Sequence, residues 1–527
     1  MITTGKLGLV ARRYLLSLSL SGPAALPLLV DSPSYAGEDA EQTGTSVRPI
    51  ANAITELDVV RAHDLIEKTK GASPGLAYER ARLAIYVGDC DSAEAILKTL
   101  PETPESGRLL DLARACAKAT AGSVVVEDKE RGVWVRVQDA GDAALVPLIA
   151  EVAAKARSTM HDDLGVLLPS PLRIDLVRDL FSLAAVSGLP LEAAETTGTV
   201  AVARWGRVTM LSPRAARLGY PWQDTLAHEI THLALTRGSR DFAPLWLQEG
   251  IAKREETRWR PVRPFDDKRD PYKIARDALL SGESVGIDKI GPSIAMLPTA
   301  HAANISYAEV QSFMDFWIKE NGRDAFTLLL ADLKGLSTRE TDQVMLSVTG
   351  FPLSYWIGRW QEHLRSLPVA PEDKPGQADE SGSVIQSVRL GDLLTKQAHD
   401  DAAAHYFDQA LAKDSHTPAV RFRAAAAALK RGDTSAAWER LGDLEAVSGL
   451  HGGWLGLHGR MFLERQETER ALSELSLAVA VDPYGEEAAC EGHGSRTQAP
   501  SGAVSAQLPT DPARRKLCEE ARTLTRD

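Results

Sequence analysis

Two histidines and two glutamates near the middle of the chain have the residue types and the spacing to bind a metal ion. His228 and His232 are four residues apart, Glu229 directly follows the first, and Glu249 comes shortly after the second. Residues four apart on a helix lie on the same face, so both imidazoles can reach one ion. Two histidines and a carboxylate, with a fourth position open to water, are typical of catalytic zinc. A further glutamate beside them can act as a general base.

The histidines must be presented by a helix that begins near Trp222. Its apolar stripe at helical spacing consists of Leu226, Ile230, Leu233 and Ala234, and the histidines fall almost opposite this stripe. We therefore expect the apolar side to pack on a core and the histidines to face a cleft. A second helix should follow after a short loop, with Pro244 in its first turn and Asp241 as its cap. Glu249 would then lie in its second turn, within reach of the histidines.

The combined pattern resembles the gluzincin metallopeptidases, the group that contains thermolysin and the zinc aminopeptidases. The residues that carry the resemblance are His228, Glu229, His232, Trp246, Leu247, Glu249, Gly250 and Ala252. They resemble more closely the small peptidase-MA-like domains that often accompany tetratricopeptide repeats, over roughly the middle half of the chain. The resemblance implies zinc ligation by His228, His232 and Glu249, with Glu229 as the general base.

The chain departs from this family at one position. Thermolysin-like members place an acidic residue, which orients a histidine, four positions after the ligand glutamate, and Lys253 stands there. That orienting group must therefore come from elsewhere. In the aminopeptidase branch a downstream tyrosine stabilises the oxyanion, which points to Tyr307, with His301 as the second candidate. Tyr307 could equally be an ordinary helix-packing aromatic residue.

Length and patterning divide the chain into several parts, because 527 residues exceed a single core. We expect a signal peptide at 1–36, a tetratricopeptide-like helical segment at 37–121, a peptidase-MA-like domain at 122–367, a linker at 368–385, tetratricopeptide repeats at 386–484, and a flexible stretch with a capping helix at 485–527. The expected fold class is multidomain α+β, in which a mixed-sheet lobe and a helical lobe are flanked by all-α repeats.

The local patterns that support this division are strands, a hairpin and a repeat. Alternating apolar residues predict strands at 124–126, 133–137 and 172–176, and a hairpin at 199–211 with Trp205 and Gly206 at its turn. The resemblance implies that this hairpin supplies the edge strand that pairs with substrate. Ala403, Phe407 and Ala410 recur 34 residues on as Ala437, Leu441 and Leu444, and again as Ala471, Leu475 and Ala478. This period is that of tetratricopeptide repeats, with Gly391 and Gly459 at the small-residue position.

The N-terminus and the cysteines indicate the compartment. Lys6, Arg12 and Arg13 precede an interrupted apolar run at 15–30, and Ser34-Tyr35-Ala36 is a small-x-small cleavage pattern. The run is shorter than the ~20 residues of a spanning helix, so we expect export to the periplasm or the exterior without a stable membrane span. Two local disulfides are then expected, Cys90 with Cys116 and Cys490 with Cys518. Other pairings, or free buried thiols, remain alternatives.

Two functions fit these patterns. The first is an exported zinc metallopeptidase that hydrolyses peptide bonds, whose repeats recruit protein substrates or partners through their grooves. The second is a protein-binding scaffold with a catalytically silent metallopeptidase-like domain. Glu229 favours the enzyme, because a silent domain has no need of the base. A net charge of -12 argues against nucleic acid or an anionic membrane as the main partner.

Overall fold

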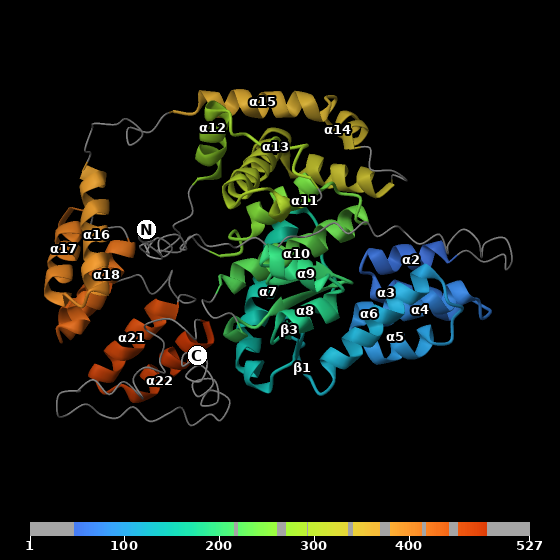
Figure 1. Cartoon of the computed structure of the whole chain (residues 1–527), viewed down its shortest axis with the longest axis horizontal. Coiled ribbons are helices and arrows are strands. Elements are labelled where there is room, and N and C mark those ends of the chain that lie inside the picture. The colour runs from blue at the N-terminus through green and yellow to red at the C-terminus, as the bar shows by residue number, and fades with distance from the viewer. Residues whose placement is uncertain are drawn as a thin grey trace, which may run out of the picture.

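The computed structural model describes residues 47–215, 220–260, 270–291, 293–335, 341–368, 380–413, 418–441 and 452–481. Within them the chain is mostly helical and has one mixed five-stranded sheet, in agreement with the α+β class. In Figure 1 the sheet lies at the centre, with the N-terminal helices beside it and a helical lobe at the top of the view. No helix of the described residues is both long enough and apolar enough to cross a bilayer. The predicted signal peptide, Cys490, Cys518 and the predicted capping helix lie outside the described residues.

The first described helices form an N-terminal block, consisting of α2 (Arg48–Thr55), α3 (Val59–Lys68), α4 (Pro74–Val87), α5 (Cys90–Leu97) and α6 (Pro104–Thr120). Side chains cap most of them: Asp58, Ser73, Asp89 and Thr103 each accept a backbone N–H of the following first turn. Gly88 ends α4 in the left-handed conformation, so that α5 can start almost immediately. A disulfide joins Cys90 to Cys116, which is one of the pairings that the sequence allows.

The sheet has the strand order β1-β2-β3-β5-β4. Its strands are β1 (Val124–Asp128), β2 (Val133–Val137), β3 (Leu172–Val177), β4 (Ala201–Arg204) and β5 (Arg207–Leu211). The three central strands are parallel to each other, and both edge strands are antiparallel to their neighbours. Between β2 and β3 lies α7 (Val146–Leu164), where the helical spacing of the sequence predicts a helix at 144–160. Two short helices that the sequence pattern did not predict, α8 (Leu180–Ser187) and α9 (Leu191–Thr197), precede β4.

β4 and β5 form the predicted hairpin. Trp205 and Gly206 make its turn, with φ of 56° and 70°, and positive φ at both positions suits the right-handed twist of the strands. A Cβ atom at Gly206 would lie 2.6 Å from the Tyr86 ring of α4. The tip of the hairpin is therefore pressed against the N-terminal block, and β4 forms an edge of the sheet.

The helical lobe follows the hairpin. It begins with α10 (Trp222–Ser239) and α11 (Leu245–Glu255), and continues through α12 (Pro271–Ser281), α13 (Ala300–Gly335), α14 (Thr341–Thr349) and α15 (Leu353–Ser366). α13 consists of two helices that meet at Gly322, whose φ of 84° is not helical. The apolar spacing of the sequence predicts two helices here, at 306–320 and 324–333, and Gly322 lies between them.

The C-terminal part contains helix pairs in the described residues: α16 (Glu380–Lys396) with α17 (Asp400–Lys413), α18 (Pro418–Lys430) with α19 (Thr434–Leu441), and α21 (Gly452–Glu464) with α22 (Thr468–Val481). A Cβ atom at Gly391 would lie 2.4 Å from the Phe407 ring, and one at Gly459 would lie 2.6 Å from Leu475. Glycine therefore lets the two helices of a pair approach closely, as the helical hairpins of a 34-residue repeat require.

Candidate metal centre

The helix α10 carries His228, Glu229 and His232. Its histidines do not face an open cleft as expected, because every side chain from Trp222 to Leu235 is buried. The reason lies in its neighbours, since α10 packs against β4, β5 and α7 as well as against α11 and α13. The side chains of the two histidines are consequently only 0% and 4% exposed.

A tight turn brings α11 back beside α10. The Thr236 hydroxyl donates to Asp241 Oδ1 at 2.6 Å, so Asp241 closes the end of α10 and does not cap α11 as predicted. Pro244 is the residue before the helix and not part of its first turn. The Ser239 hydroxyl accepts the Ala243 N–H at 3.2 Å and fixes the turn between the two helices. Glu249 falls in the second turn of α11, as predicted.

Gly250 lets α11 lie very close to α13. A Cβ atom at this position would be 2.5 Å from the Val310 carbonyl oxygen and 2.7 Å from Met314 Cγ. Any larger residue would push the two helices apart. Gly250 therefore allows α11 to pack closely on α13. This close packing places Glu249 between α10 and α13.

The side chains of His228, His232 and Glu249 converge. The two Nε2 atoms are 3.2 Å apart. Glu249 Oε2 lies 3.7 Å from His228 Nε2, and Glu249 Oε1 lies 4.0 Å from His232 Nε2. Ligand atoms bound to tetrahedral zinc at 2.0–2.2 Å are about 3.3 Å from one another, so these three side chains fit a zinc ion with little movement.

The electrostatics of the cluster also suit a cation. Burial raises the pKa of Glu229 to about 8, and burial together with the Glu229 carboxylate raises the pKa of Glu249 well above its usual value. Burial and the neighbouring His228 lower the pKa of His232, which keeps this ring neutral as a metal ligand requires. Without a cation these raised pKa values favour the protonated carboxyl groups, and the charged forms of two buried groups so close together need a compensating positive charge. A divalent cation between the three ligands would supply it.

Glu256, which no sequence pattern indicated, lies directly behind His228. Its Oε2 is 3.3 Å from His228 Nδ1 and 2.8 Å from Lys253 Nζ. A carboxylate beside Nδ1 favours the tautomer that leaves Nε2 free for a metal. The orienting acid absent at Lys253 is thus found three residues later, and Lys253 is its ion-pair partner. The sequence offers one signal for this role of Glu256, which is that it lies seven residues, or two helical turns, after Glu249.

Tyr307 of α13 also reaches the site. Its hydroxyl is buried and has no hydrogen-bond partner among the described residues. The Lys253 ammonium lies 5.1 Å from the centre of its ring. Burial raises its pKa well above 10, and the carboxylates of Glu249, Glu256 and Glu229 raise it further. The tyrosine is therefore protonated beside these carboxylates and able to donate a hydrogen bond.

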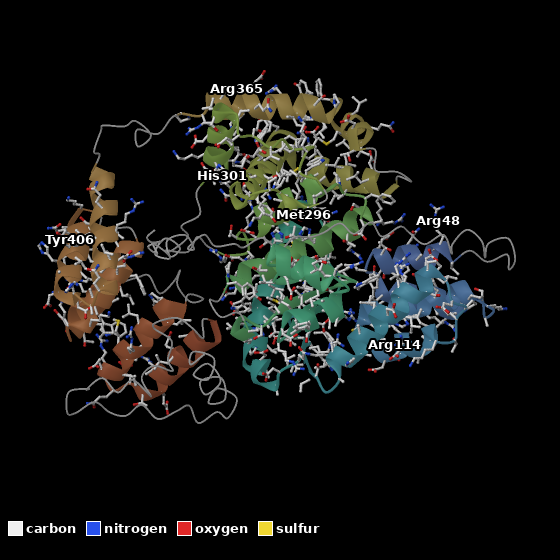
Figure 2. All side chains as sticks on the ribbon, in the orientation of Figure 1. Arg48, Arg114, Met296, His301, Arg365 and Tyr406 are labelled. Carbon is white, nitrogen blue, oxygen red and sulfur yellow. A yellow bond between two sulfur atoms is a disulfide. The ribbon has the colours of Figure 1, made fainter. Side chains whose placement is uncertain are left out.

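His301, the second candidate donor, does not reach the cluster. It lies on the surface of the helical lobe (Figure 2), where its side chain is 67% exposed and faces Glu283 at 3.6 Å. The edge strand β4, in contrast, packs against α10, and the Ala203 backbone lies close enough to Glu229 to oppose part of the increase in its pKa that burial causes. The β4 edge of the sheet thus runs beside Glu229.

Comparisons with protein-family models, curated proteins and solved structures found no match to this chain. The functional assignment therefore depends on the residues and their geometry. Within the described residues, the group His228, His232 and Glu249 is the one that brings three possible metal-ligand atoms within 4.8 Å of one another.

Proposed function

We propose that the chain is a zinc-dependent metallopeptidase of the gluzincin type that acts outside the cytoplasm. The observation that carries this proposal is the convergence of His228, His232 and Glu249, with Glu229 on the same helix. A structural zinc site would need no acid at Glu229, because a fourth protein ligand would complete it.

Each residue has a separate task in peptide hydrolysis. A zinc ion at the three ligands would supply Lewis-acid chemistry and make a water molecule acidic. Glu229 takes the proton from the attacking water and returns it to the departing amine, so the peptide bond gains one water molecule overall. Tyr307 donates a hydrogen bond to the oxyanion of the tetrahedral intermediate. The β4 edge offers backbone groups that can align an extended peptide.

The repeats give the proposed enzyme a way to select proteins. Helix pairs with a 34-residue period stack into arrays whose grooves bind peptide segments or partner surfaces. The described pairs α16–α17, α18–α19 and α21–α22 follow the peptidase-like part of the chain. We propose that they recruit a protein substrate or a protein partner.

The decisive experiment compares the purified chain with its Glu229→Gln variant. We expect one zinc per chain in both proteins, and a loss of about 10²–10⁴-fold in kcat on peptide substrates in the variant, because only the base is removed. Metal content is measured by atomic absorption and turnover with a peptide library. Stoichiometric zinc without turnover on any peptide by the unmodified chain would instead favour the silent scaffold.

A further inference from the structure

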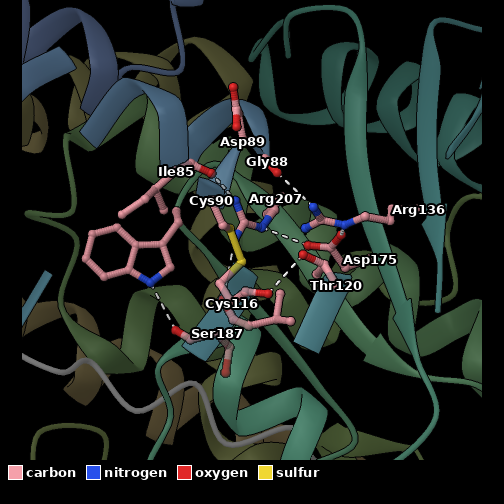
Figure 3. The surroundings of a disulfide bond; sticks show 12 residues. Ile85, Gly88, Asp89, Cys90, Cys116, Thr120, Arg136, Asp175, Ser187 and Arg207 are labelled. Atoms are coloured by element: carbon pink, nitrogen blue, oxygen red, sulfur yellow. Dashed lines mark hydrogen bonds and ion pairs between the residues drawn. A yellow bond between two sulfur atoms is a disulfide. The ribbon is translucent and has the colours of Figure 1, made fainter. Parts of the chain in front are cut away.

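A buried cluster of charges joins the sheet to the N-terminal block beside the Cys90–Cys116 disulfide (Figure 3). Arg207, the first residue of β5, is fully buried, and its Nε lies 2.8 Å from Asp175 Oδ2 in β3. Arg136 of β2 pairs with the other oxygen of Asp175, at 2.6 Å. Two guanidinium groups thus share one carboxylate, and one positive charge remains to be compensated inside the protein.

Backbone carbonyl groups of the surrounding helices provide this compensation. Arg207 donates to the carbonyl oxygens of Ile85 and Val186, and Arg136 donates to that of Gly88 at 2.7 Å. Ile85 lies in the last turn of α4 and Gly88 caps that helix. The carbonyl end of a helix carries partial negative charge. The C-terminal end of α4 therefore binds both arginines. A movement of this helix end would shift Arg136 in β2 and Arg207 in β5.

The disulfide fixes this end of α4. Cys90 begins α5 two residues after Gly88, and the bond to Cys116 in α6 spans a sequence separation of 26 residues. Both cysteines are buried, and Cys116 Sγ lies 3.6 Å from Arg207 Nη2. The sulfur atoms, the helix end and the guanidinium group are in direct contact, so breaking the bond alters all three.

The same arginine anchors the β4–β5 hairpin. Arg207 directly follows the turn, whose Trp205 indole donates to the Ser187 carbonyl at 3.0 Å. On the other side of the turn, β4 runs along α10 with Ala203 close to Glu229. A displacement of Arg207 would therefore be transmitted through the hairpin to the edge strand beside the metal centre.

We propose that the Cys90–Cys116 disulfide is a redox-sensitive lock on the β4–β5 hairpin. A dithiol reductant would transfer two electrons and two protons, break the sulfur–sulfur bond and become a disulfide itself. Without the bond, Cys90 and Cys116 no longer tie the start of α5 to α6, so the adjacent end of α4 and its Ile85 carbonyl can move away from the Arg207 guanidinium group. The hairpin is loosened, whereas the ligands on α10 and α11 keep their positions.

The test compares the full-length oxidised protein with the protein reduced by dithiothreitol. We expect backbone amides of residues 201–211 to exchange hydrogen about tenfold faster after reduction, while those of α13 are unchanged. Zinc content is compared between the unmodified chain and the Cys90→Ala, Cys116→Ala variant without reductant, because dithiothreitol itself chelates zinc, and it should stay the same. Unaltered exchange in the hairpin, or equal acceleration in α13, would overturn the proposal. If the buried bond resists the reductant, the double variant Cys90→Ala, Cys116→Ala breaks it permanently, and unaltered hairpin exchange there overturns it as well.

The consequence for turnover rests on the proposed peptidase activity and is measured separately. With the edge strand loosened, we expect a higher KM for extended peptides and little change in kcat, because the base and the metal ligands are not displaced. A chain without any turnover would refute the peptidase but not the lock, since hydrogen exchange does not depend on catalysis. Unchanged exchange in an active enzyme would refute the lock alone.

Discussion

At the scale of single residues, one oxygen atom of Glu256 faces both His228 Nδ1 and Lys253 Nζ, at 3.3 Å and 2.8 Å. The ammonium group pairs with the carboxylate, and the carboxylate faces the imidazole. With Glu229 and Glu249 included, three carboxylates and one ammonium group are buried together. With all three carboxylates ionised, a divalent cation would bring their total charge to zero, which supports the proposal of a metal of charge two.

The first prediction concerns Glu256. Replacing it with Gln should weaken zinc binding by about 10–100-fold, the usual effect of removing the carboxylate behind a histidine ligand. Competition with a chromogenic chelator measures the affinity without any need for activity. Glu283→Gln is the matched control, because Glu283 is exposed and pairs with His301 away from the site. Equal zinc affinity in the two variants would show that Glu256 does not position His228.

The second prediction concerns Tyr307. Replacing it with Phe keeps the packing of the ring but removes the hydroxyl, so zinc should remain bound while kcat falls by about 10²–10³-fold, the effect of losing one oxyanion donor. Tyr406→Phe, in the repeat helix α17, is the control and should leave kcat unchanged. Steady-state kinetics with zinc content measured in parallel decides the question. An unchanged kcat in Tyr307→Phe would make this residue an ordinary packing aromatic.

At the scale of secondary structure, Gly250 gives the third prediction. Gly250→Ala should lower the free energy of unfolding by about 1–3 kcal/mol, because its methyl group cannot fit against the Val310 carbonyl. It should also weaken zinc binding, since α11 carries Glu249. Gly358→Ala is the control in α15, where a Cβ atom would meet nothing within 4 Å. Chemical denaturation measures the free energy of unfolding of both variants. If Gly250→Ala is as stable as Gly358→Ala, α11 and α13 are not in close contact.

The sequence predicts most of these elements because their patterns are local. The spacing of His228 and His232, the alternation in the hairpin and the break near Gly322 each depend on a few neighbouring residues. α8 and α9 were missed, since each spans at most eight residues and carries no strong periodicity. Asp241 was misassigned because Thr236 competes for its carboxylate. Glu256 was missed because its role depends on where α11 ends relative to His228, which is a property of tertiary packing.

At the scale of the whole molecule, the candidate metal centre lies where three parts of the fold meet. The hairpin supplies β4, α10 and α11 supply the ligands, and α13 supplies Tyr307. The N-terminal block presses on the hairpin through Tyr86 and Gly206, and it contacts α10 through Glu56, which pairs with Arg240 at 2.5 Å and with Lys334 of α13 at 2.9 Å. Loss of metal should therefore affect the stability of the molecule and not only of one helix.

The last prediction follows from the buried acids. In the metal-free folded protein the pKa of Glu229 is raised to about 8, against about 4.5 for the exposed group, so the protonated form is favoured. A group with a raised folded-state pKa contributes its full stability below the unfolded pKa and loses it as the pH rises through the folded pKa. In the metal-free protein, Glu229 by itself should consequently contribute a loss on the order of a few kcal/mol between pH 5 and pH 8, and the lowered pKa of His232 opposes this loss only up to about pH 6.5. Zinc should oppose this loss, because it favours the charged carboxylates and binds more tightly as the pH rises.

Thermal unfolding with and without a chelator should show a difference in Tm that widens with pH, and Glu229→Gln should make the metal-free curve flatter. A difference that is the same at pH 5.5 and pH 8.5 would contradict the assignment of these acids to a metal centre.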